Sequence, residues 1–145
     1  MISLALRTVF PFRWNDFRII RVIFLIYAFG FLYGTWNHIV DIWRDGFLGY
    51  HDVPFLVNLY WTSLTFLDPL AVILLFTLPL HGVLLSVLIM ASDLAVNLSV
   101  ALYFYWQGGA FFDDRLILQM AFGCFVFLTA PFIWKKFKSS STRIP

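Results

Sequence analysis

Two aspartates lie inside a segment that is otherwise almost wholly apolar. Between Phe66 and Tyr103 the sequence reads FLDPLAVILLFTLPLHGVLLSVLIMASDLAVNLSVALY, with Asp68 near its start and Asp93 followed one helical turn later by Asn97. An aspartate at the centre of a membrane helix costs about 2.5–3.5 kcal/mol on insertion scales, so a chain that keeps two needs a compensation. Carboxyl groups beside an amide can hold a proton, a cation or a cationic amine.

Whether these carboxyls act together depends on the hairpin that carries them. The segment from Pro79 to Gly82 has the composition of a tight turn between two apolar runs. Asp68 precedes the middle of this segment by about twelve residues and Asp93 follows it by about as many, so an antiparallel helical hairpin brings both to one depth. Two neighbouring carboxylates cannot both be charged cheaply, and we expect them to share a proton.

A purely structural role is the alternative for both acids. Asp93 and Asn97 are four residues apart, so their side chains can bond each other on one helix face. Such bonds in membrane helices contribute about 0.6–2 kcal/mol. Asp68 could bond a neighbouring helix in the same way, and the sequence leaves both roles open.

A second group of polar residues lies in the sequence WNHIVDIW. Asn37, His38 and Asp41 are spaced three or four residues apart and can share one helix face. A carboxylate beside His38 makes a candidate proton relay toward the deeper aspartates. His51 and Asp52 follow in the next loop, but these four His and Asp residues form no zinc motif, so we predict neither a metal site nor a cofactor.

These side chains must be positioned by a membrane domain. Of the 145 residues, 61% are hydrophobic and 12% are charged, and this apolar share exceeds that of soluble domains. A helix of about 20 apolar residues crosses the roughly 30 Å of hydrocarbon, where open strands cannot satisfy their backbone groups. The sequence therefore predicts an all-α integral membrane four-helix bundle in a single transmembrane domain, with spans at about 22–43, 55–78, 83–106 and 116–134.

The basic residues predict an orientation. Eight of the ten Lys and Arg residues lie before the first predicted span or after the fourth, which places both termini in the cytoplasm. Residues 1–17, with aromatic and arginine side chains, are expected to lie in the membrane interface, and residues 135–145 to form a basic cytoplasmic tail. The short loops favour the bacterial inner membrane. Cys124 lies in an apolar run and is expected in the core.

The charge distribution also limits the partners. The net charge is only +2 and the basic residues lie at the chain ends, so we expect no nucleic acid partner. Membrane lipids are the expected surroundings. A small lipophilic ligand, a second copy of the chain or a larger membrane complex are further partners that this composition allows.

Part of the chain resembles a known family. Asp41 at the end of the first span, the loop sequence YHDVP and the motif WTSLTFLDPL around Asp68 are similar to the emopamil-binding and sigma-2-receptor (EXPERA) family of four-span membrane proteins. The similarity covers Tyr33–Leu70. It implies an occluded pocket in which the acids at positions 41 and 68 receive the cationic amine of a lipophilic ligand, or in which a sterol-like lipid binds. The isomerase branch of that family uses intramembrane His and Glu, and this chain contains no Glu.

Three functional classes follow from these features. The first is an intramembrane carboxylate site that binds or relays a proton, a cation, or a lipophilic amine or sterol-like ligand. The second is an accessory or structural subunit of a larger membrane complex, which suits a chain of four spans with short loops. The third is a lipid or sterol-type isomerase, in which two acids would act as general acid and base.

Overall fold

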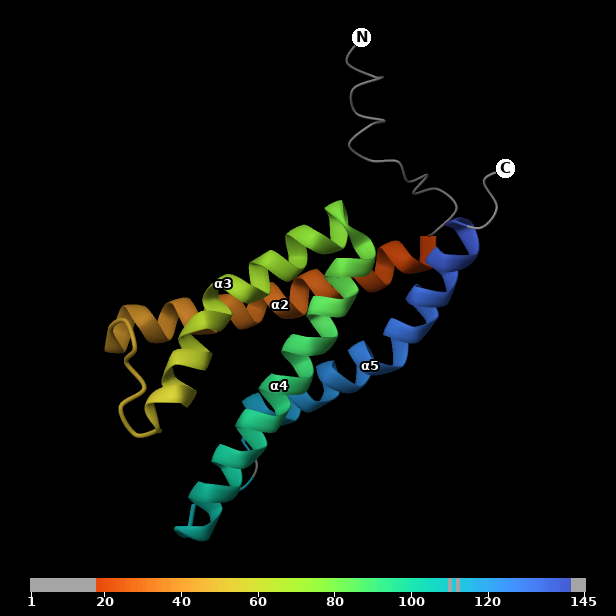
Figure 1. Ribbon diagram of the computed structural model, residues 1–145. Helices are drawn as coiled ribbons and strands as arrows, with labels where there is room; N and C mark the ends of the chain where they lie inside the picture. The colour runs from red at the N-terminus through yellow and green to blue at the C-terminus, as the bar shows by residue number, and fades with distance from the viewer. Residues whose placement is uncertain (1–17, 110, 112, 142–145) are drawn as a thin grey trace.

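The computed structural model describes residues 18–109, 111 and 113–141, so the predicted interfacial segment 1–17 lies outside the described residues. The described chain folds into four α-helices and contains no strand (Figure 1). The predicted all-α class and the number of helices are confirmed. The helices are α2, Arg18–Asp45; α3, Phe55–Thr77; α4, Pro79–Trp106; and α5, Asp114–Ser141.

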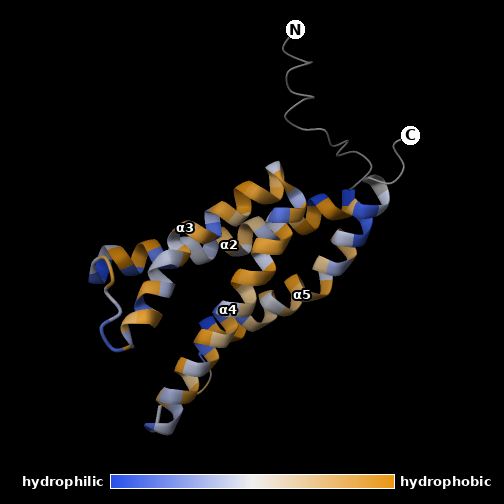
Figure 2. Cartoon of the chain, viewed as in Figure 1, coloured by the Kyte–Doolittle hydropathy of each residue, from blue (hydrophilic) through white to orange (hydrophobic). Residues whose placement is uncertain are grey.

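Each of the four helices is long and apolar enough to cross a membrane. Apolar residues cover the helices over most of their length, and hydrophilic residues gather toward the helix ends (Figure 2). Large apolar side chains such as Phe29 and Leu128 are exposed on the outside of the bundle, where lipid tails would solvate them. The chain therefore has the architecture of an integral membrane protein.

Three of the four helices, α2, α4 and α5, are longer than the apolar runs that predict them. α2 begins at Arg18, four residues before the expected span, and α5 continues to Ser141 through most of the segment that we predict to be a basic tail. Hydropathy marks the part of a helix that lies in hydrocarbon, whereas backbone hydrogen bonding continues into the polar region beyond it. At the start of α5 the Asp113 side chain accepts a hydrogen bond of 2.7 Å from the Leu116 N–H, as an N-terminal cap does.

The turn between α3 and α4 is shorter than the sequence suggests. Leu78 alone separates the two helices, because Pro79 takes the first helical position of α4, where a missing N–H costs nothing. At Gly82 an added Cβ would lie 2.3 Å from the backbone nitrogen of Leu75. The two helix backbones therefore touch beside the turn, and only glycine permits this approach.

The helices follow one another around the bundle. α3 packs on α2, α4 on α3 and α5 on α4. Arg18, Ser141 and the α3–α4 turn lie at one end, which we call the termini end, and the α2–α3 and α4–α5 connections lie at the other, the loop end (Figure 1). Toward the loop end the α2–α3 pair and the α4–α5 pair diverge (Figure 1).

The half of the bundle near the termini end has an apolar and aromatic core. Its centre is Tyr27 of α2, whose hydroxyl lies 2.9 Å from the Val126 carbonyl oxygen and 2.8 Å from Thr129 Oγ1 of α5. The Tyr27 ring packs edge-on against Phe122 and Phe125. These contacts join the first and last helices of the bundle.

Removing the Tyr27 hydroxyl gives a first testable prediction. Tyr27→Phe keeps the ring contacts but loses the bonds to α5, so we expect the free energy of unfolding to fall by about 1 kcal/mol. The matched control is Tyr33→Phe on the same helix, because the Tyr33 side chain is 51% exposed. Reversible unfolding in mixed detergent micelles measures both variants, and equal losses would contradict the assignment.

The prediction that Cys124 lies in the core is wrong, because its side chain is exposed on the outside of α5. A membrane helix is apolar both where it meets lipid and where it meets other helices. Hydrophobicity alone therefore cannot tell which of these two surroundings a thiol has.

Candidate functional site

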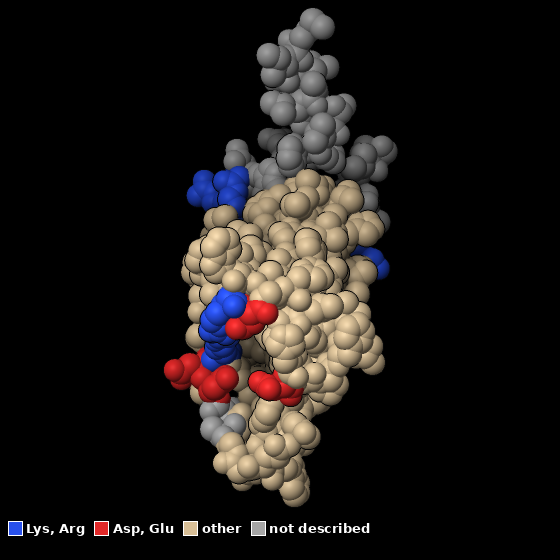
Figure 3. Space-filling view, turned by 90° about the vertical axis from the view of Figure 1, so that its left-hand side faces the viewer, with Lys and Arg blue, Asp and Glu red and all other residues tan. Residues whose placement is uncertain are grey.

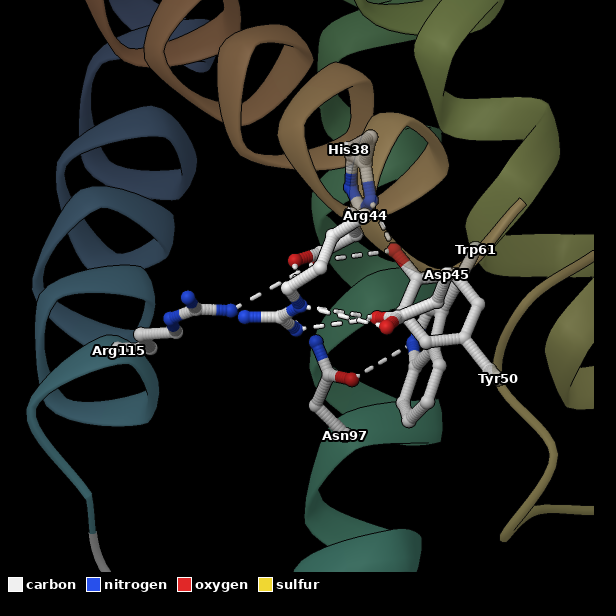
Figure 4. Close-up of polar contacts among 8 residues, drawn as sticks. His38, Arg44, Asp45, Tyr50, Trp61, Asn97 and Arg115 are labelled. Carbon is white, nitrogen blue, oxygen red and sulfur yellow. Dashed lines mark hydrogen bonds and ion pairs between the residues drawn. The ribbon is translucent and has the colours of Figure 1, made fainter. Parts of the chain in front are cut away.

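A cluster of polar side chains joins α2, the α2–α3 loop and α5 at the loop end; we call His38, Asp41, Arg44, Tyr50 and Arg115 the loop-end cluster (Figure 4). The Tyr50 hydroxyl donates to Asp41 Oδ2 at 3.0 Å and accepts from His38 Nδ1 at 3.2 Å. Arg44 and Arg115 approach the Asp41 carboxylate to 3.6 and 3.8 Å. Asp41 is buried, and its charge is compensated from three sides.

The loop that carries Tyr50 is held in a defined conformation. The Asn58 side chain donates to the Leu48 carbonyl oxygen at 2.8 Å, and Leu48 has a positive φ of 59°. The Tyr50 ring packs edge-on against Trp61 with centroids 5.0 Å apart. Burial, and then the neighbouring Asp41 carboxylate, raise the pKa of Tyr50 above its ordinary value, so its hydroxyl remains a hydrogen-bond donor at neutral pH.

A second group of polar side chains lies deeper in the bundle, and we call Trp61, Asp93, Asn97 and Gln119 the amide network. Trp61 Nε1 donates to Asn97 Oδ1 at 2.8 Å. Asn97 Nδ2 donates to Gln119 Oε1 at 2.8 Å and to Asp93 Oδ1 at 3.1 Å, and Gln119 Nε2 donates to Asp93 Oδ2. The network ties α3, α4 and α5 together, and it contains the bond between Asp93 and Asn97 that their spacing indicates.

The direction of every bond in the amide network follows from the indole. Trp61 can only donate, so the oxygen of Asn97 must face it and the amide nitrogen of Asn97 must point the other way. Gln119 then turns its oxygen to Asn97 and its nitrogen to Asp93. Asp93 is left as an acceptor at both oxygens, which suits a carboxylate held in a structural role.

Asp68 is placed differently from Asp93. Its residue is only 5% exposed, and its Oδ1 atom has no hydrogen-bond partner among the described residues. The buried hydroxyl of Thr65, three residues earlier on α3, also has no partner in this part of the chain. Gly34 of α2 leaves room for the carboxyl, because an added Cβ there would lie 2.7 Å from Asp68 Oδ2.

The two aspartates lie on neighbouring helices but not at one depth. Because the turn is at Leu78, Asp68 lies about ten residues from it and Asp93 about fifteen, a difference of about 7 Å along the helices. Asp68 is therefore closer to the termini end, and the equal depth expected from a longer turn is wrong.

Polar residues on α2 and α3 form stripes that lead toward Asp68. On α3, Trp61, Thr65 and Asp68 follow one another at spacings of four and three residues, which place them on one helix face. On α2, Asp41 and His38 continue to Gly34 at spacings of three and four. Polar side chains are thus spaced along α2 and α3 between the loop end and Asp68.

The structure brings some of the predicted site residues together and separates others. His38 and Asp41 meet through Tyr50, and Asp93 meets Asn97. Asn37 is half-buried and takes no part in these contacts. Among the described residues no group of three or more His, Cys, Asp or Glu side chains could hold a metal ion.

Other residues of the site are absent from the sequence-based prediction. Gln119 carried a usable signal, because it is an uncharged polar residue inside a predicted span and follows Arg115 by one helical turn. In the sequence, Tyr50 and Trp61 have the positions of ordinary interfacial aromatic residues, so nothing marks them as parts of a site. Gly34 belongs to a small-xxx-small pattern whose partner, Asp68, only the structure identifies.

No family model, no curated protein and no solved structure matches this chain. The resemblance to the EXPERA family therefore stays a prediction.

Proposed function

We propose that the protein is an integral membrane protein that binds and releases a proton at Asp68. In this proposal both termini lie in the cytoplasm, the loop end faces the opposite side, and the membrane is a bacterial inner membrane. The termini-end basic residues within the described chain support this orientation: Arg18, Arg21, Lys135, Lys136 and Lys138. The polar series from the loop end supplies groups that can pass a proton toward Asp68.

The observation that carries the proposal is the contrast between the two intramembrane acids. Asp93 accepts hydrogen bonds at both oxygens, as a carboxyl that joins helices should. Asp68 is buried, yet its Oδ1 has no partner in the described chain. A buried, unpartnered carboxylate is costly, whereas the protonated form is neutral. Asp68 Oδ1 thus makes no hydrogen bond that would join helices, and the carboxyl is suited to binding and releasing a proton.

An amine held jointly by Asp41 and Asp68 is less well supported. Asp41 already has Tyr50, Arg44 and Arg115 around its carboxylate. A cationic ligand there would have to compete with two guanidinium groups for one charge. The isomerase alternative needs two acids free to act on one substrate, and Asp93 is committed to amide donors.

The structural-subunit alternative has one observation in its favour. The amide network alone explains why Asp93, Asn97 and Gln119 are present, because it ties three helices together. Under that alternative Asp68 would be a further joining group, and losing its carboxyl would weaken the bundle. The proposal of a proton-binding Asp68 predicts no such loss of stability.

Dicyclohexylcarbodiimide tests the proposal directly, because this apolar reagent modifies protonated carboxyl groups that are shielded from water. In detergent-solubilised protein we expect Asp68 to be modified in preference to Asp93 and to the exposed Asp52. The modification should decrease as pH rises, by about tenfold per unit once the carboxyl has begun to lose its proton. Peptide mass spectrometry locates the adduct, and Asp68→Asn is the control.

Two results would contradict the proposal. Asp68 could stay unmodified at every pH at which the protein is folded. Alternatively, Asp93 could react as fast as Asp68, which would show that hydrogen bonding does not distinguish the two acids.

A further inference from the structure

We infer that Asp68 exchanges its proton with one side of the membrane only, the side that holds the loop end. The inference rests on the proposed function and adds the direction of access. It makes the protein a one-sided proton-binding site instead of a channel that conducts protons across the membrane.

Polar side chains reach from Asp68 to the loop end. Tyr50 links the α2 and α3 stripes, because its ring packs against Trp61 of α3 and its hydroxyl bonds His38 and Asp41 of α2. At the surface, acidic and basic side chains gather in one region of an otherwise mostly uncharged face, which is hollowed beside them (Figure 3). Water and side-chain hydroxyls there can exchange protons with the bulk solvent.

The same helix face becomes apolar on the other side of Asp68. Ala71 and Leu75 continue the stripe of α3 at spacings of three and four residues, and both are 0% exposed. They belong to a hydrophobic core whose members toward the termini end include Ile20, Phe24 and Val83. A proton therefore meets an apolar barrier between Asp68 and the termini end.

The few hydroxyl groups on that side are already engaged. Ser86 donates to the Gly82 carbonyl oxygen of its own helix at 2.8 Å. The Tyr27 hydroxyl is held by Val126 and Thr129. Both hydroxyls donate their hydrogen to backbone carbonyl oxygens, so neither has a donor left to continue the polar series.

Few titratable groups surround Asp68 from the packed elements. α4 carries Asp93, whose carboxyl is bonded to Asn97 and Gln119, and α3 carries Tyr60, whose hydroxyl is bonded to Ser92. α2 presents Gly34, which carries no charge. α5 contributes the uncharged Gln119 through its bond to Asp93. A response to pH in this region can come from Asp68, Asp93, Tyr60 or His38, and the mass-spectrometric adduct on Asp68 distinguishes that carboxyl from the others.

Sided liposomes test the inference with the same carbodiimide, which reaches Asp68 through the lipid. Protein in one orientation is exposed to acid on the loop side and alkali on the termini side, and then to the reverse gradient. We expect about tenfold more modification of Asp68 per unit of acidification on the loop side, and no change when only the termini side is acidified. Modification that follows the termini side, or both sides equally, would overturn the inference while leaving the proton site itself intact.

Leu75→Ser gives an independent check by extending the polar stripe across the barrier. In this variant the carbodiimide modification of Asp68 should also increase when the termini side is acidified. Leu70→Ser is the matched control, because Leu70 is on the same helix but exposed to lipid; it should keep the one-sided response. If the Leu75 variant does not fold, Ala71→Ser places a smaller hydroxyl in the same barrier. A one-sided response in a folded Ala71 or Leu75 variant would show that these residues do not form the seal.

Discussion

Gly82→Ala is expected to destabilise the bundle by about 3 kcal/mol or more, which places it among the most damaging single-methyl additions available in this chain. The new Cβ would lie 2.3 Å from the Leu75 backbone nitrogen and 2.5 Å from its Cα. Backbone atoms cannot rotate away as side-chain atoms can. With only Leu78 between the helices, α3 and α4 would have to separate along their whole contact.

Gly123→Ala is the control for this prediction. Its Cβ would also lie close to a neighbour, 2.6 Å from Leu94 Cδ1, but that atom ends a flexible side chain. We expect a loss of about 1 kcal/mol, since the leucine can change rotamer. Unfolding of both variants in the same detergent mixture measures the difference. Equal stability of the two variants would show that the helices do not touch beside the turn.

The same substitution at the two intramembrane aspartates should have different effects on stability. Asp93→Asn turns one acceptor into a donor that faces the donating nitrogen of Gln119. Trp61 prevents the amide network from reversing, because an indole cannot accept. We expect the free energy of unfolding to fall by about 1–3 kcal/mol.

Asp68→Asn should instead leave stability unchanged or increase it at neutral pH. No hydrogen bond of Oδ1 is lost. The variant also no longer has to hold a proton that the unfolded chain would release. A loss comparable to that of Asp93→Asn would support the structural-subunit alternative.

The four helices could be predicted because hydrophobic length is a property of sequence alone. α3, for example, begins at Phe55 and ends at Thr77, close to the expected 55–78. The start of α4 could not be predicted so well, since Pro79 and Gly82 both favour a turn and proline is common both in loops and at the first position of a helix.

The candidate site could be predicted only in part. Asp93 and Asn97 are on one helix, so their spacing is enough to predict a bond. Gln119 and Trp61 reach the same bond network from other helices, and their rotation about the helix axis depends on packing. The unpartnered state of Asp68 is likewise a property of its neighbours, above all Gly34.

The most direct test compares the stability of the unmodified protein with that of Asp68→Asn over a range of pH. The folded protein keeps the Asp68 proton, whereas the unfolded chain releases it above the ordinary aspartate value of about 3.9. The folded state then binds more protons, so its stability relative to the variant must fall as pH rises, by up to about 1.4 kcal/mol per unit. Once Asp68 loses its proton in the folded state as well, the difference should become constant. A difference that stays constant from acid to alkaline pH would mean that Asp68 does not hold a proton in the folded protein.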